Sequence, residues 1–369
     1  MFHDIKGVGM VNGVMSEDNK AIKKYYIAYM DILGYKDFFS KHSDQVFEFF
    51  KRINAAVQDT KSHIGNVNKS VILRNGADLN IIVKMFSDNI LLCVEVKNGS
   101  VELIRLLTFL STVAEIQRTF IIKYGLFLRG GVTIGDLAIN DDIVFGQGII
   151  DAVTLEETAI YPRIILSESI TEFAYKRHYV SEENLSLCRE ILNRCEEGQE
   201  ILQGEQEFIS HNAQLISIEY FTHIWKCELL AQDADGVHFL NYLYKLYVSE
   251  MMPDNQLQSI VILLKRFFPA DLGMIVVNEP NYVEKLKMHR EKVEDKLIEY
   301  GHYNDISTGS VKEANIRERV LQKYMWAMSF HNFISMKNKF PEYIINAQAN
   351  CENRFMKMII RVERNAVSG

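Results

Sequence analysis

The stretch from Tyr25 to Gly34 constrains the fold of this chain most. It opens with an aromatic and aliphatic run, which is typical of a buried strand, and the run ends in a carboxylate, Asp31. Gly34 then allows a backbone turn, and Phe38 and Phe39 begin an amphipathic pattern that predicts a helix. A carboxylate between a buried strand and a helix N-terminus suits a site that holds a metal ion and a phosphate together.

The patterning that follows predicts the order strand, helix, two strands, helix, strand, and then one more helix and strand. Expected strands cover 24–30, 81–86, 90–96, 126–134 and 163–166, with a short one at 71–73, and expected helices cover 37–60, 100–123 and 146–157. This β-α-β-β-α-β order predicts an α/β (α+β) fold with a ferredoxin-like core and an additional αβ unit. Gly130 and Gly131 lie inside an expected strand, which indicates a bulge or the close approach of a backbone or ligand.

The length of 369 residues suits two domains. We expect a loose leader over 1–22, an α/β core over 23–168 and a mainly helical region over 169–369 that supplies dimer contacts. Helices are expected at 171–202, 238–252, 255–268, 282–300, 311–338 and 341–365, with a strand pair at 208–218 broken by His211 and Asn212.

Charge and composition exclude several classes of function. The net charge of -7 argues against a dedicated nucleic-acid binder, although one nucleotide needs few cations. The 5 cysteines form no CxxC pair, and the N-terminus does not resemble a signal peptide, so we expect free thiols in a reducing compartment. No apolar run approaches the ~20 residues of a membrane span. The expected location is the cytoplasm, with no membrane partner.

A second carboxylate, Asp88, lies in a tight turn between two expected strands. In a β-α-β-β layout the end of the first strand and the turn of the hairpin meet at one edge of the sheet. Asp31 and Asp88 would then face each other, and two aspartates without histidine or cysteine favour Mg²⁺ or Mn²⁺ over zinc. The alternative is that Asp31 caps the following helix and Asp88 simply occupies the turn, and spacing alone leaves both open.

Several segments, taken in order, resemble class III nucleotidyl cyclases, and most closely the bacterial pyrimidine cyclases of the Pycsar anti-phage systems. They are Asp31 to Tyr35, Phe86 to Asp88, Arg129 to Gly135, Phe145 to Glu156, Tyr161 to Ile164, Asp235 to Gly236 with Asn241 to Leu243, and Lys323 to Trp326 with His331 and Asn332. The resemblance covers about residues 25–335. Each motif is short, so the similarity rests on their order and spacing together.

The resemblance implies that Asp31 and Asp88 hold two divalent ions, with the Ile32 carbonyl as a further ligand. It also implies that turn amides from Ile32 through Leu33, Gly34 and Tyr35 to Phe38 receive a triphosphate. The ribose 3′-oxygen would attack the α-phosphorus and release pyrophosphate, which converts UTP or CTP to cUMP or cCMP. The family forms head-to-tail homodimers with composite active sites, and the cyclic nucleotide acts on a separate effector that binds it.

The chain departs from purine cyclases at two positions. Those enzymes carry an Asn and an Arg four residues apart on the helix that matches 146–156, and here the positions fall on Ile150 and Thr154. Neither side chain can neutralise a transition state, so another cation is needed. Arg129 is the first candidate because its planar fork suits phosphate oxygens, and Arg163 is the second. The alternative for each is an arginine paired with a carboxylate in the core.

Lys84 lies where purine cyclases place a residue that reads the base, four residues before the second aspartate. The companion aspartate of adenylate-type enzymes would fall near Ile143, with Asp141 and Asp142 just upstream. This pair is not preserved, which fits a base other than adenine. The alternative for Lys84 is a strand residue that faces solvent.

Two other functions remain open at this point. One is another enzyme, either a purine cyclase that acts on ATP or GTP or a relative that uses two aspartates for a different phosphoryl transfer. The other is a degenerate cyclase-like module that binds nucleotide as a sensor or dimerisation domain, which the replacements at Ile150 and Thr154 favour and the two aspartates oppose.

Overall fold

The computed structural model of the chain describes residues 22–35, 46–69, 79–97, 99, 101–140, 143–176, 178–245, 260, 262–263, 281–301 and 311–345. The first part of the described chain contains β1 (Lys23–Ile32), α2 (Val46–Lys69), β2 (Ile82–Phe86), β3 (Asn89–Glu95), α3 (Glu102–Tyr124), β4 (Leu128–Ile139), β5 (Val144–Phe145), α4 (Gln147–Thr158) and β6 (Ile164–Leu166). The second part contains α5 (Glu168–Tyr175), α6 (Glu182–Glu196), α7 (Gln203–Leu229), β7 (Leu230–Gln232), β8 (His238–Leu240), α9 (Tyr282–Gly301), α10 (Val311–Lys337) and a 3-10 turn (Pro341–Tyr343).

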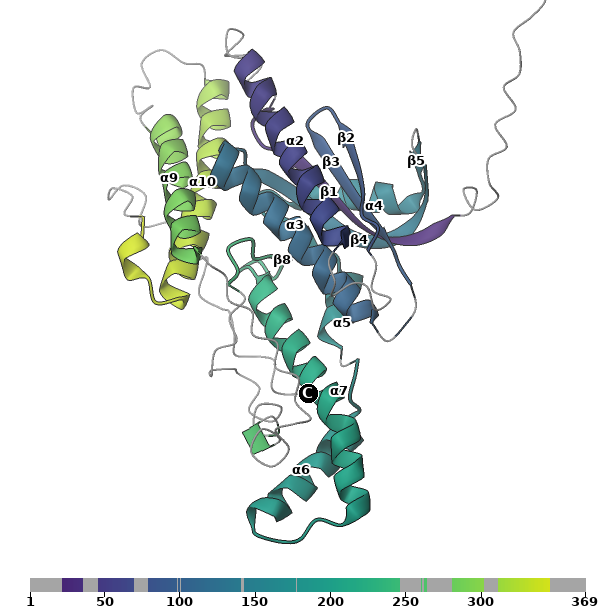
Figure 1. The fold of residues 1–369 in the computed structure, drawn as a ribbon. Coiled ribbons are helices and arrows are strands. Elements are labelled where there is room, and N and C mark those ends of the chain that lie inside the picture. Colours follow the sequence, from purple (N-terminus) through teal and green to yellow (C-terminus); the bar gives the residue numbers. More distant parts are fainter. Residues whose placement is uncertain are drawn as a thin grey trace, which may run out of the picture.

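The strands form one sheet, which has eight strands within the described residues (Figure 1). Its order is β2-β3-β1-β4-β6-β8-β7, and β5 pairs with β4 off this path. The first four strands are antiparallel in the order β2-β3-β1-β4, which is the ferredoxin-like arrangement. β6 then joins β4 in parallel. The expected α/β (α+β) fold class is therefore confirmed.

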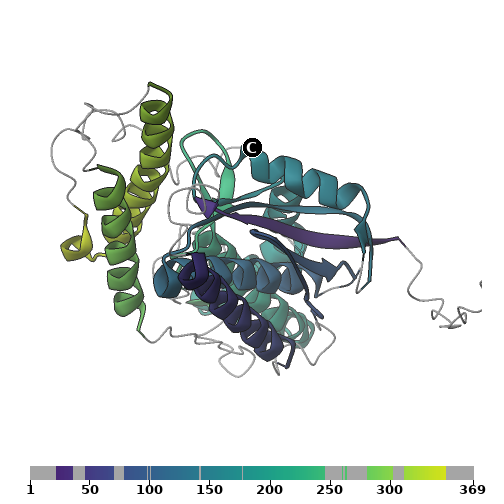
Figure 2. The same cartoon turned by 90° about the horizontal axis from the view of Figure 1, so that it is seen from above.

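The two faces of the sheet have different coverings. Alternate β1 residues such as Tyr26 and Met30 pack with α2 and α3 in the main core, since successive side chains point to opposite faces. The other set, which includes Tyr25 and Ile27, lies on the face that α4 covers. Asp31 has the same alternation as this second set, so it lies on the face that α4 covers. Figure 2 shows the sheet between α2 and α3 on one side and a helical layer on the other.

Two glycines of β4 allow α4 to lie directly on the sheet. A Cβ at Gly131 would come within 2.8 Å of the Leu155 side chain and 3.0 Å of the Glu156 nitrogen. A Cβ at Gly135 would come within 2.5 Å of the Cα of Gly148, at the start of α4. The close backbone approach expected for the glycine-containing strand is confirmed, and the approaching backbone is α4.

Several expectations for the second half of the chain were wrong. The expected strand pair at 208–218 lies within α7, where the buried Ile209, Ala213 and Ile216 recur at helical spacing. Short apolar runs are ambiguous between the two periods, which explains the error. The expected helix at 171–202 is two helices, α5 and α6. The expected helix at 238–252 begins as β8, because Phe239 pairs with Ile165 on the edge of β6.

Other expectations lie outside the described residues. These include the leader over 1–21, the helix start at 37, the strand at 71–73, most of the helix at 255–268, and the segment 346–365. The sheet itself crosses the expected boundary at residue 168, because β7 and β8 come from the second half of the chain. None of the helices among the described residues has the length and apolar character that a membrane span requires.

A buried cluster around Arg163 fastens β6 to the β7–β8 turn and to α10. The guanidinium pairs with Asp233 and, at 2.6 Å, with Asp235, and the Arg163 side chain is 1% exposed. The indole nitrogen of Trp326 donates to the same Asp233 carboxylate at 2.7 Å. Tyr161 stacks on Trp326 with the ring planes 8° apart. One arginine therefore ties together three segments that are distant in sequence.

A second buried chain of hydrogen bonds joins α9 to α10, which lie side by side in Figure 1. His331 faces the Tyr343 carbonyl at 2.9 Å and so must donate from Nε2. Its Nδ1 then accepts from Nδ1 of His289 at 3.0 Å, and His289 Nε2 accepts from the hydroxyl of Tyr242 at 3.1 Å. Burial lowers the pKa of both imidazoles, which keeps them neutral, and the terminal carbonyl then fixes both tautomers.

The Arg163 cluster predicts a large stability effect. Replacing Arg163 by Met leaves the Asp233 carboxylate buried without its cation, which should cost about 3–5 kcal/mol in the free energy of unfolding. Urea denaturation measures the change. Lys51→Met removes an exposed ion pair with Glu48 and should cost less than about 1 kcal/mol. Equal losses in the two variants would contradict a structural role for the buried cluster.

Candidate functional site

A row of polar residues crosses three neighbouring strands on the face that α4 covers. Asp31 of β1 pairs with Asn89 of β3 on one side and with Arg129 of β4 on the other. The row lies near the C-terminal end of β1, where the chain leaves the sheet. Because cross-strand neighbours lie side by side, the register alone brings the Asp31 and Arg129 side chains together.

The hairpin between β2 and β3 brings the second aspartate to this row. Ser87 and Asp88 form the turn, and Asp88 accepts a backbone hydrogen bond at 3.1 Å from the nitrogen of Ile32. Ser87 adopts a φ of 57°, in the left-handed region that glycine favours. The Asp88 carboxyl lies close enough to Asp31 to raise the pKa of the latter. Asp31 and Asp88 therefore meet at one sheet edge, as expected from the topology.

Arg129 lies between two carboxylates. Its Nε is 3.3 Å from Oδ2 of Asp31 and 2.7 Å from Oε1 of Glu156, a residue of α4. The Arg129 side chain keeps 25% of its surface exposed. Within the part of the chain that the structure describes, neither Nη1 nor Nη2 has a hydrogen-bond or ion-pair partner. The guanidinium thus turns its Nε toward the carboxylates and keeps four N–H donors for a ligand.

Glu156 is the residue of this site that the sequence interpretation missed. It comes from the buried face of α4, where Gly148, Ala152 and Glu156 recur every four residues. That spacing marks the helix face that lies on the sheet, and the carboxylate is its one charged member. A charged residue on a stripe of small buried ones was the signal that could have identified it, because a buried carboxylate needs a cation nearby.

The carboxyl groups of the site resist ionisation because they are buried and close together. Burial raises the pKa of Asp31, with Arg129 opposing this effect and Asp88 adding to it. Burial likewise raises the pKa of Glu156 to about 7, again opposed by Arg129 and increased by Asp31. Burial and the same carboxylates raise the pKa of the Tyr29 hydroxyl. A cation bound near these carboxyl groups would favour their ionised forms and lower the pKa values again.

The raised pKa of Glu156 predicts a pH dependence of stability in the metal-free protein. Between its ordinary value of 4.5 and about 7, the folded state holds a proton that the unfolded state has released. The contribution of Glu156 to the free energy of unfolding is therefore full below about pH 4.5 and is lost as the pH rises through 7. The loss is at most about 3 kcal/mol.

The variant that tests this is Glu156→Gln, which keeps the shape of the protonated acid. In EDTA it should match the wild type near about pH 5 and exceed it near about pH 8 in the free energy of unfolding. Glu157→Gln, at an exposed position on the same helix, is the control. Parallel pH profiles for the wild type and Glu156→Gln would contradict the raised pKa.

The turn after β1 offers fewer free amides than the sequence suggested. The Ile32 nitrogen donates to the Asp88 carbonyl at 3.1 Å and the Leu33 nitrogen to the Phe127 carbonyl at 2.9 Å. These two amides are therefore already used, and a phosphate cradle would begin at Gly34, which has a φ of 84°. Tyr35 packs against Phe49 with the ring centroids 6.0 Å apart. Residues 36–38 lie outside the described residues.

Of two other expected site residues, Lys84 lies on the sheet face of the site and Arg163 lies in the buried cluster away from it. Lys84 pairs with Leu91 in the register of β2 and β3, one row along from Asp31 and on the same face of the sheet. Arg163 is committed to Asp233 and Asp235 in the buried cluster. This matches the alternative interpretation of an arginine paired in the core.

The two positions that replace the purine-cyclase residues face away from the site. Ile150 is 57% exposed on α4. Thr154 is also exposed, and its hydroxyl donates to the Ile150 carbonyl at 2.9 Å. In the described arrangement neither side chain contacts the Asp31 row.

The oxygen donors of the site fit a hard divalent cation. Asp31 supplies a carboxylate from the end of β1, and Asp88 supplies one from the turn between β2 and β3. Among the described residues, no group of three or more His, Cys, Asp or Glu side chains is arranged to hold a metal ion. Mg²⁺ usually binds through one or two carboxylates and completes its shell with water and substrate phosphates, so the donor set fits this ion or Mn²⁺.

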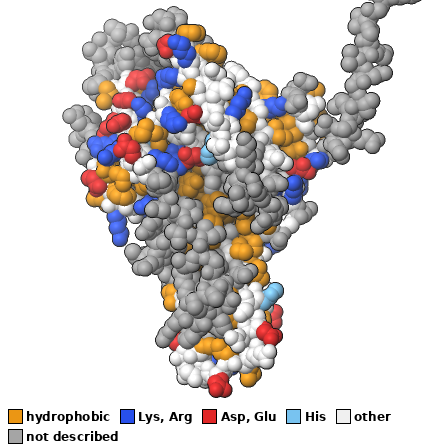
Figure 3. All heavy atoms as spheres, viewed as in Figure 1, with side chains coloured by type: hydrophobic (Ala, Val, Ile, Leu, Met, Phe, Trp, Pro, Cys, Tyr) orange, Lys and Arg blue, Asp and Glu red, His pale blue; other side chains and the backbone are white. Residues whose placement is uncertain are grey.

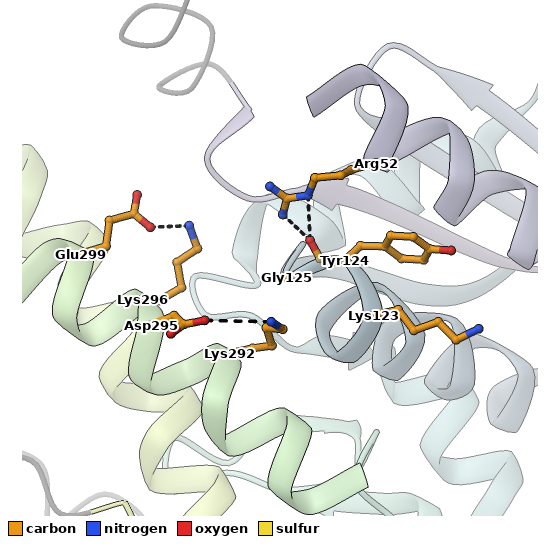
Figure 4. A pocket seen from close by; sticks show the side chains of 8 residues that line it. All are labelled: Arg52, Lys123, Tyr124, Gly125, Lys292, Asp295, Lys296 and Glu299. Atoms are coloured by element: carbon orange, nitrogen blue, oxygen red, sulfur yellow. Dashed lines mark hydrogen bonds and ion pairs between the residues drawn. The ribbon is translucent and has the colours of Figure 1, made fainter. Parts of the chain in front are cut away.

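A separate hollow of about 370 Å³ lies where α9 meets α2 and the end of α3 (Figure 4). Its lining is Arg52, Lys123, Tyr124, Gly125, Lys292, Asp295, Lys296 and Glu299. Arg52 donates to the Tyr124 carbonyl at 3.0 Å, and Lys296 pairs with Glu299 at 2.6 Å. Figure 3 shows basic and acidic side chains interleaved on this side of the molecule. The hollow is therefore lined by charged side chains whose ion pairs with one another lie within α9, while the Arg52 hydrogen bond joins α2 to the end of α3.

Comparisons with known proteins identify no family. No protein-family model matches the chain, and no curated protein matches it. Among solved structures, the adenylyl cyclase CyaB from P. aeruginosa matches with a TM-score of 0.32 and 11% sequence identity, over 41% of this chain and 80% of that chain. A TM-score this low carries no argument about function.

Proposed function

We propose that the chain is a nucleotidyl cyclase that converts a pyrimidine nucleoside triphosphate, UTP or CTP, to its 3′,5′-cyclic monophosphate and pyrophosphate. The observation that carries the proposal is the convergence of Asp31, Asp88 and Arg129 at one edge of a ferredoxin-like sheet. The motif resemblance of the sequence supplies the reaction and the preference for a pyrimidine. By the same resemblance, the product would signal phage infection to a separate effector that binds it.

The residues have distinct tasks in this proposal. Asp31, Asp88 and the Ile32 carbonyl would hold Mg²⁺ or Mn²⁺, which supplies positive charge for the triphosphate and acidifies the ribose hydroxyl. Arg129 would direct its Nη groups at phosphate oxygens, where negative charge accumulates during transfer. Gly34 would let the backbone approach the phosphates, and Lys84, on the same sheet face, would contact the base. Catalysis is then mostly positioning and charge neutralisation.

The direct test incubates purified protein with Mn²⁺ and each of the four NTPs and separates the products by chromatography. We expect cyclic product from UTP or CTP, and none from Asp31→Asn or Asp88→Asn, because each loses a metal-binding carboxylate. Asp151→Asn, at an exposed position on α4, should retain full activity. Product from ATP or GTP would indicate a purine cyclase, and nucleotide binding without any product would indicate a sensor module.

Arg129 provides a second test of the mechanism. Arg129→Ala should lose about 2–4 kcal/mol of transition-state stabilisation, as happens when one oxyanion donor is removed, and cyclisation should slow accordingly. The comparison of kcat/KM with the wild type measures this loss. A change of less than a few-fold would exclude Arg129 as the cation that replaces the missing arginine of α4.

We also propose that the chain is a homodimer. Large apolar side chains are exposed on β5 and α4, with Phe145 of β5 68% exposed and Ile150 of α4 57% exposed. Ile143, just before β5, is 60% exposed. Such side chains grouped on neighbouring elements favour a protein interface over open solvent.

The dimer proposal has a matched control within the chain. Ile150→Asp should shift the protein from dimer to monomer in analytical ultracentrifugation, because it places a charge in the interface. Ile298→Asp, at an equally exposed position of α9 (57%), should leave the mass unchanged. An unaltered mass for both variants would exclude the α4 face as the interface.

A further inference from the structure

We propose that the buried hydrogen-bond relay through His289 and His331 is an acid-sensitive latch, which releases α9 and α10 from the edge of the sheet in mild acid while β1 and its neighbours stay folded. The inference is independent of the proposed cyclase activity, because neither histidine belongs to the candidate site. It assigns a task to a buried polar chain that the proposed function leaves unused.

The relay connects four segments of the chain. Tyr242 follows β8, His289 lies in α9, His331 lies in α10, and Tyr343 lies in the 3-10 turn after α10. The side chains of Tyr242, His289 and His331 are all 0% exposed. Figures 1 and 2 show α9 and α10 as a pair at one end of the sheet. The relay is therefore a polar connection between this helix pair and the chain that leaves the edge strand β8.

Hydrogen bonding through the relay runs in one direction in the neutral state. The Tyr343 carbonyl only accepts, so His331 donates from Nε2 and accepts at Nδ1. His289 then donates from Nδ1, and its Nε2 accepts from the hydroxyl of Tyr242. Each imidazole nitrogen has a partner of the opposite kind, so the relay has no acceptor left for an additional proton.

One added proton breaks the relay at Tyr242. A proton on Nε2 of His289 faces the Tyr242 hydroxyl, which must then accept instead of donate. A proton on Nδ1 of His331 forces His289 to accept at Nδ1 and to donate from Nε2, with the same result. Among the described residues the hydroxyl has no other hydrogen-bond partner. Its own proton is then buried without an acceptor, which is costly.

The surroundings do not compensate a charged imidazole. Burial lowers the pKa of both histidines; His331 adds to this effect at His289, and the Tyr343 carbonyl opposes it at His331. Two charged side chains of α9 also act on His331, where Arg290 lowers the pKa and Glu294 raises it. These two side chains pair with each other at 2.8 Å. No carboxylate is therefore left over to balance a proton on the relay.

The direction of the pH effect follows from the lowered pKa values. When the helices open, water reaches both imidazoles and they take protons with an ordinary pKa of about 6.5. The contribution of the relay is therefore full above about pH 6.5 and is lost as the pH falls below it. Glu156 acts in the opposite direction, because its contribution is lost as the pH rises through about 7. The two effects are thus separable by pH.

Hydrogen exchange of the full chain, read by mass spectrometry, tests the inference. The opening constant is the equilibrium constant between the open and closed forms of an amide. It is measured at about pH 7.5 and about pH 5 for the helices α9 and α10 and for β1, after correction for intrinsic exchange rates. The double variant His289→Gln/His331→Gln removes both titrating groups but keeps a donor and an acceptor at each position. His211→Gln, at an exposed position of α7, is the control.

We expect the opening constant of α9 and α10 in the wild type to rise on acidification by about thirtyfold if one histidine takes its proton only on opening, and by up to about nine hundredfold if both do. The opening constant of β1 should rise far less. His211→Gln should behave as the wild type does, and the double variant should lose most of the rise.

Three outcomes would overturn the inference. A wild-type opening constant of α9 and α10 that does not rise in acid would mean that the relay is no latch, and this result needs no variant to fold. An equal rise in β1 would mean that acid unfolds the whole protein and does not release the helix pair. An undiminished rise in the double variant would assign the acid sensitivity to another group.

Discussion

The site depends on one electrostatic constraint: three carboxylates lie close together at the edge of a sheet, and a single arginine lies among them. Isolated carboxylates in such a position would stay protonated, because burial and mutual repulsion both oppose ionisation. Arg129 opposes both effects at Asp31 and at Glu156. The arrangement leaves the site short of positive charge, which is the condition under which a metal ion and a phosphate-bearing ligand bind together.

The fold supplies this arrangement through register and close packing. Antiparallel pairing places Asp31 between Asn89 and Arg129. The two-residue turn of the hairpin brings Asp88 to the same edge. The glycines of β4 let α4 approach the sheet, so that a side chain from the helix reaches Arg129. The charge cluster is the combined result of these contacts.

Much of this could be predicted from the sequence. An aromatic and aliphatic run that ends in a carboxylate identified β1, a turn by composition identified the hairpin, and the order of elements identified the ferredoxin-like core. The partners of the arginines could not be predicted, because ion pairing depends on tertiary contacts. Arg163 finds Asp233 and Asp235 about seventy residues away, and Arg129 finds Glu156 across a helix–sheet contact. The sequence did not predict β7 and β8, because whether such short segments form strands depends on a sheet edge being available and not on their own pattern.

The most direct measurement is a crystal structure with Mn²⁺ and a non-hydrolysable UTP or CTP analogue, with anomalous data collected at the manganese absorption edge. The account predicts anomalous peaks about 2.2 Å from carboxylate oxygens of both Asp31 and Asp88. It also predicts the Nη groups of Arg129 on phosphate oxygens. Manganese bound elsewhere, or a triphosphate that contacts neither aspartate-bound metal nor Arg129, would contradict it.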